Sequence, residues 1–164
     1  MHLKNFKISW IKNKQIKSDL KEFIGNIIEK KGPDITGILL FGSLAQGKAV
    51  FSTDYQSDVD LLIAALNLPS EIFPRKLYTA HLSKAYGCGI HQLWYTPLEI
   101  TNEVNSHRAF FMEIIKYGII LFEIGKFFTN LKDTVDTIIR EKGIIESEHA
   151  WIWPQEIPGS KIEW

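Results

Sequence analysis

The chain has 164 residues, of which 45% are hydrophobic and 23% are charged, a balance typical of a folded protein and not of a disordered or collagen-like one. We expect this length to form one compact domain with short extensions and no second full domain. Nineteen basic residues against nineteen acidic ones leave no net charge, which argues against nucleic acid or an anionic membrane as a partner.

The first predicted elements are a helix and a buried strand. Apolar residues recur at helical spacing over residues 13–31, where lysines are frequent, and Gly32 and Pro33 then provide a stop. Residues 35–41 form a short, nearly continuous apolar run that ends at Gly42, which predicts a buried strand. Residues 1–31 carry eight lysines against three acidic residues. We interpret these lysines as a solvated helix face, although they keep nucleic-acid modification open as a third function.

A second strand, a helix and a third strand follow. The apolar run over residues 59–64 predicts another largely buried strand. Residues 70–86 have a helical composition, but Pro74 should confine the regular helix to residues 75–86. A third strand is expected over residues 89–95, ending at a turn formed by Thr96 and Pro97.

Two helices and an aromatic tail are predicted for the rest of the chain. A helix is expected over residues 107–117, where Gly118 terminates or bends it, and another ends near Lys142. The tail from Gly143 contains Trp151, Trp153 and Trp164, and we expect it to pack on its own domain, with insertion into a partner chain as the alternative. We therefore predict an α/β (α+β) fold with a small mixed sheet flanked by helices. The predicted units are residues 1–125, including the N-terminal helix, and residues 126–164, the C-terminal helix and tail.

Two polar segments attached to the first two strands carry the chemistry. Gly42 allows a sharp turn and a close approach to a ligand, and Ser43 adds a hydroxyl group and begins a run of backbone N–H groups that can bind phosphate oxygens. Asp58 and Asp60 are two residues apart on a strand, so their carboxylates project from one face and can share divalent cations. One cation would activate an attacking hydroxyl group and another would hold a triphosphate and its leaving pyrophosphate.

These segments resemble those of the minimal nucleotidyltransferases of the DNA polymerase beta superfamily. The resemblance rests on a GSxAxG signature followed by a DxD pair, and it extends over about residues 35–125. The resemblance implies that the nucleotide contacts Gly42, Ser43, Gln46 and Gly47. The matching residues are Gly42-Ser43-Leu44-Ala45-Gln46-Gly47, Ser57-Asp58-Val59-Asp60-Leu61, Trp94-Tyr95-Thr96-Pro97-Leu98-Glu99, and the segment FFMEIIKYGIILFE that begins at Phe110.

The chain departs from the family pattern at three places. Gln46 stands where the family often has arginine, and residues 51–55 lengthen the segment between the two motifs. The third departure is His91, which stands where these folds usually present a third carboxylate. Imidazole is a poor ligand for magnesium and a better one for softer ions such as manganese. Three interpretations stay open: His91 acts as the general base, a carboxylate such as Asp54 or Glu99 takes that role, or the site binds a nucleotide without turnover.

The resemblance implies a metal-dependent enzyme with Mg²⁺ or Mn²⁺ as cofactor. It would transfer a nucleoside monophosphate, most simply AMP from ATP, to a hydroxyl group on a protein or small molecule. Asp58 and Asp60 would bind the metal, with His91 beside the attacking group. The alternative is an antitoxin-type module that pairs with a helical HEPN-like protein, and a homodimer is a further expectation.

Targeting and redox features predict the cytoplasm as the location. Cys88 is the only cysteine, which excludes an internal disulfide and fits a reducing compartment. The first ten residues, MHLKNFKISW, contain lysines and no apolar core of the kind found in a secretory signal. No apolar run approaches the roughly 20 residues that a membrane-spanning helix needs.

Overall fold

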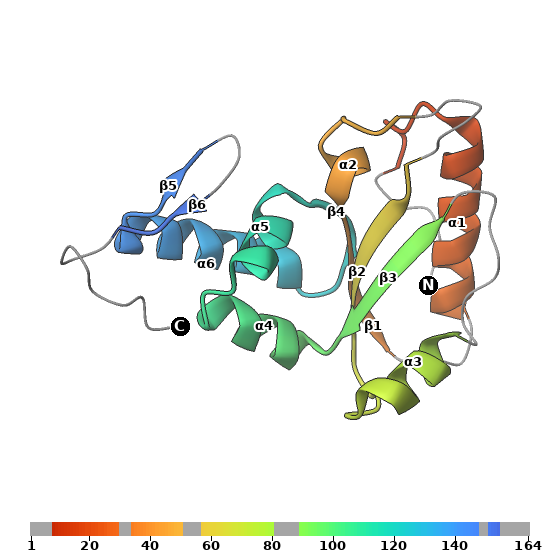
Figure 1. Cartoon of the computed structure of the whole chain (residues 1–164). Coiled ribbons are helices and arrows are strands. Elements are labelled where there is room, and N and C mark those ends of the chain that lie inside the picture. The colour runs from red at the N-terminus through yellow and green to blue at the C-terminus, as the bar shows by residue number, and fades with distance from the viewer. Residues whose placement is uncertain (1–7, 30–33, 51–56, 81–88, 148–150, 155–164) are drawn as a thin grey trace.

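The computed structural model describes residues 8–29, 34–50, 57–80, 89–147 and 151–154 (Figure 1). Cys88 and Trp164 lie outside these ranges. The helices are α1 (Lys14–Glu29), α2 (Gly42–Ala45), α3 (Ile72–Ala80), α4 (Pro97–Asn105), α5 (Ala109–Tyr117) and α6 (Phe127–Lys142). The strands are β1 (Ile35–Phe41), β2 (Val59–Ala65), β3 (Ile90–Tyr95), β4 (Ile119–Glu123), β5 (Ile145–Glu146) and β6 (Trp151–Ile152).

Four strands form a mixed sheet in the order β3-β2-β1-β4. Strand β1 is antiparallel to both of its neighbours, β2 and β4, whereas β2 and β3 are parallel. The parallel pair requires a crossover connection, and α3 belongs to it. The predicted α/β fold with a mixed sheet is therefore confirmed.

Helices cover the two faces of the sheet unequally (Figure 1). Alternate residues of β2 point to opposite faces, because side chains in a strand alternate. Leu61 and Ile63 pack with α1 in one core cluster, whereas Leu62 and Ala64 pack with α4, α5 and α6 in another. Both clusters contain fully buried side chains, which explains why the strand reads as a continuous apolar run.

Two helices differ from the prediction, and a proline is involved in each. Helix α3 begins at Ile72 and not after Pro74, because a proline in the first helical turn lacks only an N–H group that would have no intrahelical partner there. Residues 97–105, expected to begin with a turn, form helix α4. Pro97 occupies its first turn, and Thr96 and Glu99 form a capping box that fixes its start.

The C-terminal segment contacts the helices on the second face of the sheet. Strands β5 and β6 pair as an antiparallel hairpin. The ring of Trp151 lies 6.3 Å from that of Tyr117, and the ring of Trp153 lies 5.8 Å from that of His107. Helix α6 shares a core cluster with α4 and α5. The boundary at residue 125 remains a prediction.

A half-buried lysine joins α6 to the end of α5. Lys132 Nζ donates hydrogen bonds to the carbonyl oxygens of Lys116 (2.8 Å) and Gly118 (2.7 Å). A cation is favourable at a helix C-terminus, where carbonyl groups lack intrahelical partners. Burial lowers the pKa of Lys132, because desolvation disfavours the charged form of the side chain. The contribution of this lysine therefore comes from the hydrogen bonds to the two carbonyl groups.

We expect Lys132→Met to lower the free energy of unfolding by about 1–2 kcal/mol, because the variant keeps the apolar stem and leaves the two carbonyl oxygens without their lysine donor. Urea denaturation measures the change. Lys142→Met, at an exposed lysine of the same helix, is the control and should change stability by less than about 0.5 kcal/mol. Equal effects of the two substitutions would contradict this role of Lys132.

Within the described residues, no helix combines the length and the apolar character that a membrane span requires.

Candidate functional site

Two carboxylates stand at the start of β2. Asp58 immediately precedes the strand and Asp60 is its second residue, so both side chains leave the same face. Asp58 is the more exposed of the two, with 49% of its side chain accessible against 27% for Asp60. This face is the one that α4, α5 and α6 cover further along the strand. The carboxylates therefore lie at the end of this face that the three helices do not cover.

His91 lies between the two carboxylates. It pairs with Asp60 in the parallel register of β2 and β3, which places its side chain on the same face of the sheet. Its Nε2 atom is 3.7 Å from Asp58 Oδ2, and its Nδ1 atom is 3.6 Å from Asp60 Oδ1. The structure thus brings together the three residues that the sequence analysis singled out as catalytic.

A glycine lies directly against each carboxylate. A Cβ atom added to Gly42 would lie 2.3 Å from Asp60 Oδ2, and one added to Gly89 would lie 2.2 Å from Asp58 Oδ1. Only glycine permits such an approach of the backbone. The loop after β1 and the acidic start of β2 therefore converge. The sequence analysis places residue 89 at the start of the third strand but does not assign Gly89 to the site, because its contact with Asp58 depends on the pairing of β3 with β2.

The remaining residues of the GSxAxG segment form a short helical turn. Gly42 has φ +73° and is the first residue of α2. The N-cap residue of this helix, Phe41, makes no side-chain hydrogen bond to it. Gln46 is exposed at the other end, and its backbone N–H donates to the carbonyl of Gly42 at 3.1 Å. The N–H of Lys48 donates to the carbonyl of Ser43 at 2.9 Å, so Gly47 lies in a closed turn.

Ser57 anchors the segment that leads into the carboxylate pair. Its hydroxyl oxygen accepts a hydrogen bond from the N–H of Val50, and its own N–H donates to the carbonyl of Val50, both at 2.9 Å. Ser57 is buried, with 5% exposure. Asp54, one of the carboxylates considered as a general base, lies outside the described residues.

The surroundings of Asp60 disfavour its ionised form. Burial, and to a smaller extent the charge of Asp58, raises the pKa of Asp60, while His91 acts in the opposite direction. A raised carboxyl pKa means that the folded protein disfavours the ionised form. A cation held between the two aspartates would relieve this cost.

The two aspartates fit a divalent cation whose remaining coordination positions are filled by a bound ligand. No cluster of three or more His, Cys, Asp or Glu side chains in the described parts of the chain is arranged as a metal site by itself. Mg²⁺ in proteins is commonly held by one or two carboxylates together with substrate phosphates and water. Asp58 and Asp60 supply the carboxylates, and the turn at Gly42 lies directly against Asp60.

Glu99 is held away from the site, which corrects the expectation that it could swing in as a third carboxylate. His91 lies near the start of β3, next to Asp60, whereas Glu99 follows the far end of that strand. Its Oε1 and Oε2 atoms accept hydrogen bonds of 2.7 and 2.9 Å from the guanidinium of Arg75. Its carboxylate also accepts the N–H of Thr96 at 2.7 Å.

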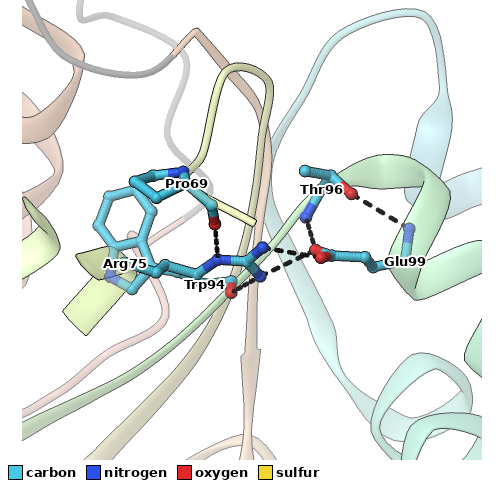
Figure 2. Close-up of polar contacts among 5 residues, drawn as sticks. All are labelled: Pro69, Arg75, Trp94, Thr96 and Glu99. Atoms are coloured by element: carbon cyan, nitrogen blue, oxygen red, sulfur yellow. Dashed lines mark hydrogen bonds and ion pairs between the residues drawn. The ribbon is translucent and has the colours of Figure 1, made fainter. Parts of the chain in front are cut away.

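Arg75 connects the crossover helix to this capping box (Figure 2). Besides Glu99, its guanidinium donates to the carbonyl oxygens of Pro69 (2.7 Å) and Trp94 (3.4 Å). Its side chain is 13% exposed. The Arg75–Glu99 pair therefore fixes α3 against the end of β3 and the start of α4, which is a structural role.

We expect Glu99→Gln to lower the free energy of unfolding at pH 7 by about 1–2 kcal/mol, because a two-pronged ion pair is lost at a carboxylate that solvent partly screens. The hydrogen bond with Arg75 holds the pKa of Glu99 below its usual value of 4.5. The stabilisation is thus present above about pH 4.5 and is lost as the pH falls through the lowered pKa. Urea denaturation at pH 7 and at pH 3 should show the difference between wild type and variant shrinking in acid.

A control substitution and a metal-binding measurement complete the test of Glu99→Gln. Glu103→Gln is the control, because its pair with Arg108 is exposed and longer, at 3.6 Å, and its loss should cost less than about 0.5 kcal/mol. Binding of Mn²⁺ should be the same in Glu99→Gln as in the wild type. Loss of Mn²⁺ binding in that variant would show that Glu99 belongs to the metal site.

Comparison with known proteins identifies one curated relative. The chain is 31% identical over 144 residues, 84% of this chain and 94% of the relative, to a Methanocaldococcus jannaschii protein named "Putative protein adenylyltransferase MJ1305". No family model matches the sequence.

Solved structures give further likenesses. One is a chain of a toxin-antitoxin crystallised with AMP-PNP, at 14% identity and a TM-score of 0.46. Another belongs to a mutant of the MntA-HpeT toxin-antitoxin, at 12% identity and a TM-score of 0.43. Each of these matches covers 76% of this chain and 86% of the other chain.

Proposed function

Because the chain belongs to the minimal nucleotidyltransferase family, we propose that it transfers a nucleoside monophosphate, most simply AMP from ATP, to a hydroxyl group of a protein or small-molecule acceptor. The observation that carries this proposal is the convergence of the Gly42 turn with Asp58, Asp60 and His91 at one end of the sheet. The name of the archaeal relative supports AMP as the transferred group.

The residues of the Gly42 turn bind and orient the nucleotide. The N–H groups at the start of α2 and the Ser43 hydroxyl contact its phosphates, and Gln46 and Gly47 complete this cofactor-binding set. The acceptor oxygen attacks the α-phosphorus, the bond from that phosphorus to the bridging oxygen breaks, and pyrophosphate leaves. Positioning of the two reactants in line provides most of the rate enhancement.

Asp58 and Asp60 hold the cofactor cation. Their carboxylates lie on one face of the strand, and burial raises the pKa of Asp60 against the opposing effect of His91, so a counter-charge next to Asp60 would favour its ionised form. Bound Mg²⁺ or Mn²⁺ would stabilise the negative charge that develops on the phosphate oxygens.

His91 accepts the proton of the attacking hydroxyl group. Two neighbouring carboxylates, each within 3.7 Å of a ring nitrogen, keep the imidazole next to the site. A neutral imidazole has a ring nitrogen that can accept a proton, which suits general-base catalysis. With Glu99 held elsewhere, the imidazole is the third side chain next to the aspartates in the described part of the chain.

The test is transfer of labelled nucleotide. Purified protein is incubated with ATP labelled at the α-phosphate, Mg²⁺ or Mn²⁺, and candidate protein and small-molecule acceptors. Label should appear on an acceptor, and ATP labelled at the γ-phosphate should give none, because that phosphate leaves as pyrophosphate. The absence of transfer with either metal, together with unchanged behaviour of an Asp60→Asn variant, would refute the proposal.

A second candidate function is an antitoxin-type module that binds nucleotide and pairs with a helical HEPN-like protein. It is favoured by the imidazole at the third position, where a carboxylate would be expected in an active member. Exposed apolar side chains on α3, Ile72, Phe73 and Leu77, offer a surface for a partner. Purification from the native host discriminates the two: a stable helical partner without nucleotide turnover supports the module.

A further inference from the structure

An exposed aromatic ring stands beside the site. Phe110, in the first turn of α5, is 55% exposed, whereas the next residue, Phe111, is 7% exposed. The Phe110 ring lies 6.4 Å from that of Phe41 at 87°, and 5.6 Å from that of Phe111 at 88°. Two edge-to-face contacts therefore hold a ring that is still largely open to solvent.

This ring is connected to the carboxylates through β1. Phe41 pairs with Asp60 in the antiparallel register, so the two side chains leave the same face next to each other. Gly42 follows Phe41 directly and opens the proposed phosphate-binding turn. Figure 1 shows α5 on the side of the sheet away from α1, with α2 above it. The order across this face is thus carboxylates, Phe41 and Phe110.

We propose that the ring of Phe110 stacks on the base of the bound nucleoside triphosphate, an inference that rests on the proposed function. With its phosphates at Gly42 and the aspartates, a nucleotide extends its nucleoside away from them, and Phe110 presents an aromatic surface on that side. Every nucleobase has a face that can stack. A ring already fixed by two neighbours loses little conformational freedom on binding, which favours affinity.

The experiment separates base recognition from phosphate recognition. Isothermal titration with Mn²⁺ measures the binding of two ligands, a non-hydrolysable ATP analogue and inorganic tripolyphosphate. Phe110→Ala should weaken binding of the ATP analogue by about 5- to 140-fold, the range for loss of one base–aromatic stack, and should leave tripolyphosphate binding unchanged. Phe110→Trp should restore the affinity for the ATP analogue.

Phe73→Ala is the matched control, because Phe73 is an aromatic residue 77% exposed on α3 and is not part of the proposed nucleotide site. It should bind both ligands as the wild type does. Equal weakening of both ligands by Phe110→Ala, or unchanged binding of both, would overturn the inference, the latter being expected if the ring contacts a protein partner. A wild-type protein that binds neither ligand would instead refute the proposed function itself.

Discussion

Replacement of Asp60 by asparagine should reduce nucleotidyl transfer by about a thousandfold while leaving the protein folded. The substitution keeps the shape of the side chain and removes half of the carboxylate pair that would bind the cation. Loss of about 4 kcal/mol of transition-state stabilisation corresponds to this factor. The measurement is the rate of label transfer from α-labelled ATP at saturating Mn²⁺.

The same substitution should raise the stability of the metal-free protein. Because burial raises the pKa of Asp60, its stabilising contribution is present below the unfolded value of 3.8 and is lost as the pH rises through the raised pKa. At neutral pH the ionised side chain is therefore a cost, and asparagine removes it. Urea denaturation of metal-free wild type and variant at pH 7 tests the sign of this change.

Asp133→Asn is the control for both effects. Asp133 is exposed on α6, far along the chain from the site, and its replacement should change neither transfer nor stability appreciably. If Asp60→Asn lowered stability and left transfer intact, the Asp58–Asp60 pair would be a structural feature and the proposed function would fail.

The part of the site that could be predicted from the sequence depends on short-range geometry. Asp58 and Asp60 share a face because side chains alternate along a strand, whatever the tertiary structure. The apolar runs at residues 35–41 and 59–64 match β1 and β2 closely, since buried strands require apolar residues on both faces. The place of His91 in the site follows from the family resemblance, and the parallel register puts it next to Asp60.

The remaining features depend on pairings that the sequence does not specify. Gly89 matters only because β3 aligns with β2, and a parallel pair joined by a long crossover has no turn to set its register. Glu99 is bound by Arg75, which lies 24 residues away along the chain. Helix α4 is a different case, because a capping box and a proline in the first turn were visible signals of a helix start.

We expect Gly42→Ala to lower both stability and activity, for two separable reasons. Gly42 has φ +73°, a conformation that costs a residue with a Cβ atom about 1–2 kcal/mol. The added Cβ atom would also lie 2.3 Å from Asp60 Oδ2, so the carboxylate has to move. Because a displacement of about 1 Å can cost a hundredfold in rate, transfer should fall by about that factor.

Gly125→Ala isolates the first of these reasons. Gly125 has φ +63° and no atom within 4 Å of an added Cβ atom, and it lies between β4 and α6. Its replacement should cost about 1–2 kcal/mol of stability and leave transfer unchanged. In an Asp60→Ala background, Gly42→Ala should lose its additional penalty and cost only as much as Gly125→Ala, because the carboxylate that it displaces is gone. Additive stability changes in that double mutant would show that the turn and the carboxylate do not touch, and the site as described would then be wrong.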